Sequence, residues 1–186
     1  MKSFIIIIGF LFCQYVLLAD INVSGISIPS NKQVHGKSLL LNGVGTREKY
    51  WMDMYVGALY LPKKSTDAQY IIQSNEIMMI ELTIVSSLIT SNKMSDAVDE
   101  GFENSTNGNT GTLQQRIQQF KSSFKEEIKK GDVYTMAYDP EKGTVVYKNG
   151  KLATTIPGLD FKRGLFGIWL CNKPADNTLK KALLGL

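Results

Sequence analysis

The chain has 186 residues, 44% of them hydrophobic and 20% charged, with a formal net charge of +4. This length fits a single domain behind a short leader, and so small a basic excess gives no sign of nucleic-acid binding. The only histidine, His35, has no histidine partner, which excludes a histidine-based metal site. We expect neither a metal nor a cofactor.

The N-terminal segment predicts export. Met1-Lys2-Ser3 carries one positive charge, residues 4–18 are almost wholly apolar, and Ala19 precedes Asp20. This pattern is typical of a secretory signal peptide, and its apolar core of about 15 residues is shorter than the roughly 20 of a transmembrane helix. We expect a signal peptide at 1–19, a mature domain at 20–186 without a membrane span, and a periplasmic or secreted location. An uncleaved anchor is the alternative.

The first third of the mature chain predicts β-structure. Expected strands cover 38–42, which continues into Gly43-Val44-Gly45-Thr46-Arg47, then 50–61 and 76–85. Gly57 weakens the second of these strands and marks a close approach by another backbone or a ligand. In the third strand, odd-numbered and even-numbered side chains fall on opposite faces.

Two helices are expected next, one from Ser91 or Ser95 to Phe102 and one over 112–130. The second helix carries apolar residues at steps of three and four, which predicts one buried stripe. Those residues are Leu113, Ile117, Phe120, Phe124 and Ile128.

The last third returns to β-structure, with strands expected at 132–138, 144–148 and 151–156. Asn149-Gly150 between the last two is a strong signal for a tight hairpin. Helices are expected at 160–170 and 178–184, and Cys171 is expected to be a buried thiol. This element order predicts an α+β fold in which helices cover one face of a large antiparallel sheet, while the other face is closed by something else or solvated.

Several motifs along the chain resemble the chalcone isomerase-like family. They are Leu-Asn-Gly-Val-Gly-Thr-Arg at 41–47, Met-Tyr-Val-Gly-Ala-Leu-Tyr-Leu-Pro at 54–62, Pro-Gly-Leu-Asp-Phe at 157–161 and Gly-Ile-Trp-Leu at 167–170. The last is similar to the C-terminal signature of the family's bacterial exported branch, and the likeness covers roughly 21–186. It implies an open-faced β-sandwich, with a cleft between the sheet and the helices. Members of the family either cyclise chalcones or bind fatty acids without catalysis.

The resemblance also assigns candidate site residues. The arginine that holds the phenolate in the enzymes corresponds to Arg47, whereas Tyr55 replaces a threonine of the neighbouring strand. On the first helix, Met94 stands at the tyrosine position of the enzymes, Ala97 at the lysine and Gly101 at the asparagine. Three polar donors are therefore replaced by groups that cannot donate a hydrogen bond.

These replacements favour non-catalytic binding of a fatty-acid-like or other amphipathic apolar ligand. A guanidinium can hold a carboxylate by two parallel hydrogen bonds, and Arg47 and Tyr55 are the expected anchors. Met94, Ala97 and Gly101 would then enlarge an apolar cleft for the rest of the ligand.

Three alternatives stay open. The chain could be an isomerase, an intramolecular lyase acting on a chalcone-like phenolic enone, with Arg47 as its candidate catalytic residue. It could be a structural or interaction protein of the cell envelope. Finally, Arg47 could simply form a surface ion pair with Glu48 or Asp53.

Overall fold

The computed structural model describes residues 20–186, and the expected signal peptide lies outside this range. Among the described residues, no helix combines the length and the apolar character needed to cross a bilayer.

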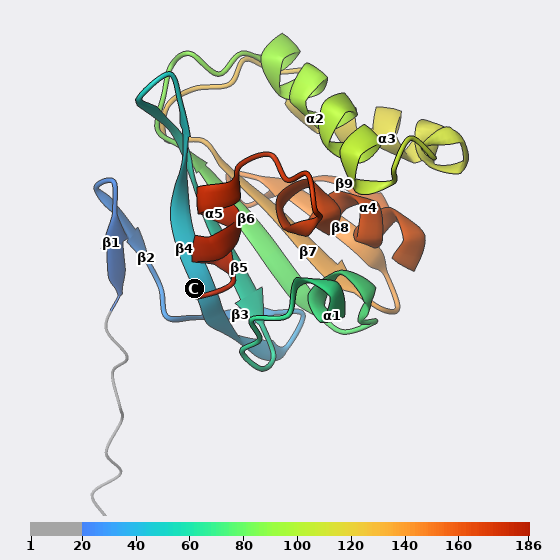
Figure 1. Ribbon diagram of the computed structural model, residues 1–186, viewed down its shortest axis with the longest axis horizontal. Helices are drawn as coiled ribbons and strands as arrows, with labels where there is room; N and C mark the ends of the chain where they lie inside the picture. The colour runs from blue at the N-terminus through green and yellow to red at the C-terminus, as the bar shows by residue number, and fades with distance from the viewer. Residues whose placement is uncertain (1–19) are drawn as a thin grey trace, which may run out of the picture.

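A seven-stranded antiparallel sheet forms the centre of the fold (Figure 1). Its strand order follows the chain, so that each strand pairs with the one before it. The strands are β3 (Asn31–Val34), β4 (Lys37–Lys49), β5 (Met52–Leu61), β6 (Met78–Ile84), β7 (Val133–Asp139), β8 (Gly143–Lys148) and β9 (Lys151–Ile156). A separate hairpin of β1 (Ile21–Val23) and β2 (Ile26–Ile28) precedes the sheet.

The helices lie together against one face of the sheet (Figure 1). They are α1 (Ala68–Gln73), α2 (Ser91–Ser105), α3 (Gln114–Lys121), α4 (Leu159–Leu170) and α5 (Asn177–Leu183). Their apolar side chains share one large core with the side chains on that face of the strands. The predicted α+β fold, an antiparallel sheet covered by a layer of helices, is confirmed.

Strand β6 is buried on both faces, and its odd-numbered and even-numbered side chains fall on opposite faces as expected. Ile80 and Leu82 belong to the helix-side core, and Met79 belongs to a second core on the opposite face. Ile28 and Val34, from the N-terminal strands, complete this second core. These short strands were not expected from the sequence, and they close part of the face that was left open.

The expected helix over 112–130 is wrong. The structure has a 3-10 turn at Gly111–Leu113, then α3, then a second 3-10 turn at Ser122–Phe124, and no helix over 125–132. The apolar stripe is nevertheless buried throughout. The Ser122 hydroxyl bonds back to the Gln119 carbonyl at 2.6 Å, and such bonds compete with helix continuation. The periodicity therefore identified the buried side chains correctly but not the backbone that carries them.

Helix α1, which was not expected, is fixed to α4 by a buried lysine. Lys162 Nζ donates hydrogen bonds to the carbonyls of Ile71 at 2.5 Å, Ile72 at 3.0 Å and Ser74 at 2.9 Å. Burial lowers the pKa of Lys162 to about 7. The lysine thus satisfies carbonyls at the end of α1 that the helix itself leaves unpaired.

Helix α5 packs directly on the glycines of β4. A Cβ at Gly43 would lie 2.0 Å from the Ala182 carbonyl oxygen, and one at Gly45 would lie 2.5 Å from the Ala182 Cβ. At Gly57 the Leu179 side chain fills the space beside the backbone, 3.4 Å from where a Cβ would lie. The glycines in this part of the sheet therefore leave the space that α5 needs to pack against the strands.

The thiol of Cys171 is buried between α4 and α5, as expected.

Candidate functional site

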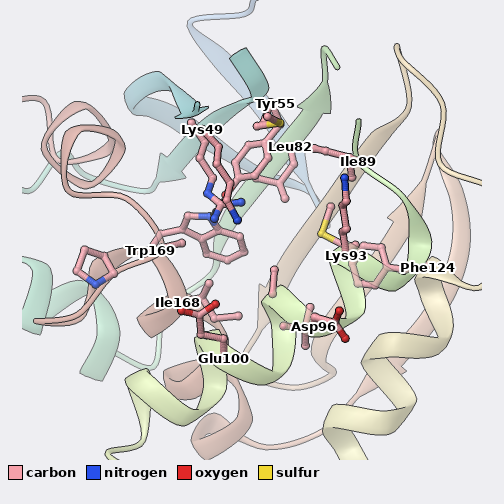
Figure 2. A pocket seen from close by; sticks show the side chains of 18 of the residues that line it. Lys49, Tyr55, Leu82, Ile89, Lys93, Asp96, Glu100, Phe124, Ile168 and Trp169 are labelled. Atoms are coloured by element: carbon pink, nitrogen blue, oxygen red, sulfur yellow. Dashed lines mark hydrogen bonds between the residues drawn. The ribbon is translucent and has the colours of Figure 1, made fainter. Parts of the chain in front are cut away.

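A pocket of about 520 Å³ lies between the sheet and helices α2 and α4 (Figure 2). This volume is within the usual range of small-ligand sites. Most of its wall is apolar. The lining side chains come from the sheet, from α2, α3 and α4, from the 3-10 turn after α3, and from the chain after β6 and after α4. The apolar lining includes Met54, Leu82, Ile89, Val98, Phe120, Phe124, Met136 and Ile168.

Arg47 brings a positive charge to the pocket. It lies on β4 directly opposite Tyr55 of β5, and its guanidinium carbon is 5.8 Å from the centre of the Tyr55 ring. The Arg47 Nε atom is buried, and it has no hydrogen-bond partner among residues 20–186. The alternative ion pair with Glu48 or Asp53 is not formed in the structure, where Asp53 instead accepts a 2.7 Å hydrogen bond from Ser24. Arg47 therefore lines the pocket without an acidic partner among residues 20–186.

Tyr55 supplies a hydroxyl group beside this charge. Trp169 Nε1 donates a hydrogen bond to the Tyr55 hydroxyl oxygen at 2.9 Å. Because the indole N–H can only donate, the phenolic oxygen must accept, and its own proton remains available for another acceptor. Burial raises the pKa of Tyr55 despite the opposing effects of Arg47 and Trp169. The hydroxyl therefore stays protonated and can donate to a ligand.

The three predicted residues of α2 form part of the apolar wall. Met94, Ala97 and Gly101 follow one another at steps of three and four, and all three line the pocket together with Arg47 and Tyr55. The structure thus brings the five predicted site residues to one cavity. Gly101 also has a packing reason to be glycine, since a Cβ there would lie 2.8 Å from the side chain of Ile168 on α4.

Other charged groups of the pocket were not predicted. Figure 2 shows Lys49 extending towards Trp169, with Asp96 and Glu100 of α2 on the opposite side of the cavity. Lys93, also on α2, donates to the Leu88 carbonyl at 3.1 Å. The positive charges of β4 are therefore separated from the acids of α2 across the cavity.

Trp169 was also missed as a site residue, although it belongs to the Gly-Ile-Trp-Leu motif. It lies on α4, 114 positions after its partner Tyr55. That motif is the one sequence signal that could have indicated its importance.

No cluster that could bind a metal, with three or more His, Cys, Asp or Glu side chains, occurs over residues 20–186. His35 lies away from the pocket and pairs with Asp139, its Nδ1 being 2.9 Å from the carboxylate oxygen.

The fold and the pocket define an α+β protein with a largely apolar cleft between an antiparallel sheet and its helices, with Arg47 and Tyr55 on its sheet side. The model of the chalcone isomerase-like family matches residues 20–185, and the chain belongs to this family. The chain is also similar to a crystal structure of an Arabidopsis thaliana fatty-acid binding protein, AtFAP1. The TM-score is 0.68 at 18% identity, over 87% of this chain and 92% of that chain. No curated protein sequence matches the chain.

Proposed function

We propose that the pocket binds a fatty-acid-like ligand without catalysing a reaction. The ligand's carboxylate lies at Arg47 and Tyr55, and its acyl chain runs along the apolar wall. The observation that carries this proposal is that Arg47 lines the pocket without an acidic partner among residues 20–186, beside a Tyr55 hydroxyl whose proton is still free to be donated. Both groups donate, so the group they would receive is an acceptor, and an anion suits the guanidinium best.

The three α2 positions that carry polar donors in the enzymes support binding over cyclisation. An isomerase needs donors at the position where negative charge develops on the substrate carbonyl. Met94, Ala97 and Gly101 offer side chains without any such donor. The name of AtFAP1 is consistent with this preference, because that protein of similar fold is a fatty-acid binding protein.

Titration of the delipidated protein with lauric acid tests the carboxylate anchor. Loss of a charged hydrogen-bond partner costs about 1.5–3 kcal/mol, so Arg47→Ala should weaken laurate binding roughly 10-fold to 100-fold. Dodecanol, which has the same chain but no charge, should bind the wild type and this variant with similar affinity. Arg163→Ala is the matched control because Arg163 is an exposed arginine of α4 outside the pocket.

Unchanged laurate affinity in Arg47→Ala, with thermal unfolding like that of the wild type, would refute the anchor. Tyr55→Phe provides a second test, since it removes the free proton and the acceptor of Trp169 together. It should weaken laurate binding several-fold. Turnover of a chalcone above the spontaneous rate would instead support the isomerase.

We also propose that the mature protein acts outside the cytoplasm, in the periplasm or after secretion. This proposal is supported by the signal-peptide pattern of residues 1–19. The intact mass of the protein recovered from its host, together with cell fractionation, tests it. A mass that includes residues 1–19 on a cytoplasmic protein would refute it.

A further inference from the structure

The turn between β4 and β5 consists of two exposed aromatic residues in a strained conformation. Lys49 pairs with Met52, which leaves Tyr50 and Trp51 as the two turn residues, with φ angles of 54° and 60°. Positive φ is unfavourable for bulky side chains. Trp51 is 97% exposed and Tyr50 is 72% exposed, so packing against the rest of residues 20–186 does not explain either ring.

This turn lies at the mouth of the pocket. Tyr50 lines the cavity, as does Leu88 from the chain between β6 and α2, and Leu88 is 42% exposed. The segment carrying Leu88 is attached to β5 by hydrogen bonds from the Val85 and Ser86 amides to the Met54 carbonyl. Figure 1 shows the β4–β5 turn at the end of the molecule remote from α1.

Around the turn, the basic side chain lies on the pocket side, whereas the acidic side chains do not line the pocket. Lys49 lines the pocket, and its Nζ lies 5.5 Å from the centre of the Tyr50 ring. It has no acidic partner over residues 20–186. The neighbouring acids, Glu48 and Asp53, lie opposite each other on the two strands and do not line the pocket. The exposed rings are therefore accompanied by an unpaired cation on the pocket side.

We propose that this surface binds an anionic lipid bilayer. The docking patch consists of Tyr50, Trp51, Met52 and Leu88, with Lys49 beside them. Tryptophan and tyrosine favour the boundary between lipid headgroups and acyl chains, because each combines an apolar ring with a polar tip. Lysine beside them is attracted to anionic headgroups. A bilayer also explains why the strain at Trp51 is retained, since the turn aims the ring away from the protein.

Docking in this orientation would bring the pocket mouth to the bilayer surface. An amphipathic ligand could then pass between the bilayer and the pocket without crossing open water. This consequence rests on the proposed function, whereas binding of the patch to lipid does not. The two can therefore be tested separately, with lipid binding measured in the absence of fatty acid.

Fluorescence quenching of the mature protein, residues 20–186, tests the docking patch. The chain has two tryptophans, and Trp169 is buried at 4% exposure, so lipids with brominated acyl chains should quench only the emission of Trp51. We expect quenching by vesicles containing phosphatidylglycerol, and at least several-fold weaker quenching by vesicles of phosphatidylcholine alone. In Trp51→Ser, the remaining emission should not be quenched.

Co-sedimentation with vesicles of the same composition measures how much protein binds. Trp51→Ser should lower the partition coefficient of the mature protein about 10-fold. Leu152→Ser is the matched control, since Leu152 is 64% exposed on β9, outside the patch, and its replacement should leave binding unchanged. Laurate affinity in solution should also be unchanged in Trp51→Ser, because Trp51 does not line the pocket.

Three results would overturn the proposal. The first is an unquenched wild type with phosphatidylglycerol vesicles, and the second is equal quenching by both kinds of vesicle. The third is self-association of the wild type without lipid that Trp51→Ser abolishes, because the patch would then join two copies of the chain. A failure of laurate binding, by contrast, would refute the proposed function and leave the docking result standing.

Discussion

Two hairpin turns of the same sheet have the same backbone conformation but are built from very different residues. The β8–β9 turn is Asn149-Gly150, with φ angles of 51° and 76°, and the β4–β5 turn is Tyr50-Trp51, with φ angles of 54° and 60°. Both are two-residue turns with positive φ at each position, the geometry that matches the twist of the strands. Asparagine and glycine tolerate this geometry well, whereas tyrosine and tryptophan do not.

The side chains of the two turns also have different partners. Asn149 accepts a hydrogen bond from the Val133 amide at 2.7 Å and donates one to the Asp132 carboxylate at 2.9 Å. Trp51 is almost fully exposed. The β8–β9 turn therefore stabilises the fold, while the β4–β5 turn carries side chains whose benefit must lie outside it. This difference is the main physical reason to assign the β4–β5 turn a binding role.

The largest expected effect comes from placing the aromatic pair in the β8–β9 turn. Asn149→Tyr with Gly150→Trp should lower the free energy of unfolding by about 3–4 kcal/mol. Strain at positive φ contributes about 1–2 kcal/mol, and the lost Asn149 hydrogen bonds contribute about 1 kcal/mol each. Urea denaturation measures the change.

Lys151→Ser is the control for this double variant, because Lys151 is exposed beside the turn and has ordinary strand geometry. It should change stability by less than about 0.5 kcal/mol. A double variant as stable as the wild type would show that positive φ is not costly in this sheet, and the contrast between the turns would lose its meaning.

The reverse exchange should stabilise the protein by a smaller amount. Tyr50→Asn with Trp51→Gly relieves the strain, but glycine also gains freedom in the unfolded chain, so the net increase should be about 1 kcal/mol. The same variant should lose its binding to phosphatidylglycerol vesicles. A variant that is less stable than the wild type, by urea denaturation, would show that the rings contribute to folding after all.

The contrast also explains what the sequence could reveal about these turns. Asn149-Gly150 has the residues that a positive-φ turn prefers, and the hairpin expected there is confirmed. Tyr50 and Trp51 have strand-favouring side chains, so they were assigned to a strand over 50–61, whereas β5 begins at Met52. When the residues of a turn prefer strand conformation, their sequence gives no sign of the turn.

The residues of the site also differ in whether the sequence could predict them. Arg47 and Tyr55 lie on strands that are adjacent in the chain, and the resemblance to the family was enough to select both. The hydrogen bond from Trp169 to Tyr55 depends on how α4 packs on the sheet, which no local pattern encodes. The short strands β1 to β3 were missed for a related reason: their burial depends on a second core on the far face of the sheet.

The smallest expected effect is a pH dependence confined to the β8–β9 side. Burial raises the pKa of Asp132, but hydrogen bonds from the Asn149 side chain and the Lys129 amide, with the charge of Lys148, outweigh this and lower it. A carboxyl whose pKa is lower in the folded state stabilises the fold above its unfolded value of about 4, and this contribution is lost as the pH falls through the folded value.

The stability of the wild type should therefore decrease more steeply than that of Asp132→Asn between about pH 5 and pH 3, by less than about 1 kcal/mol in total. Glu127→Gln, at an exposed acid of the preceding loop, should keep the wild-type slope. So should Tyr50→Asn with Trp51→Gly, because neither Tyr50 nor Trp51 carries a carboxyl group. Equal slopes in the wild type and Asp132→Asn would mean that Asp132 does not stabilise the β8–β9 turn. A flatter slope in the Tyr50 and Trp51 variant would mean that the two turns are coupled, and they could no longer be treated as independent solutions to the same backbone geometry.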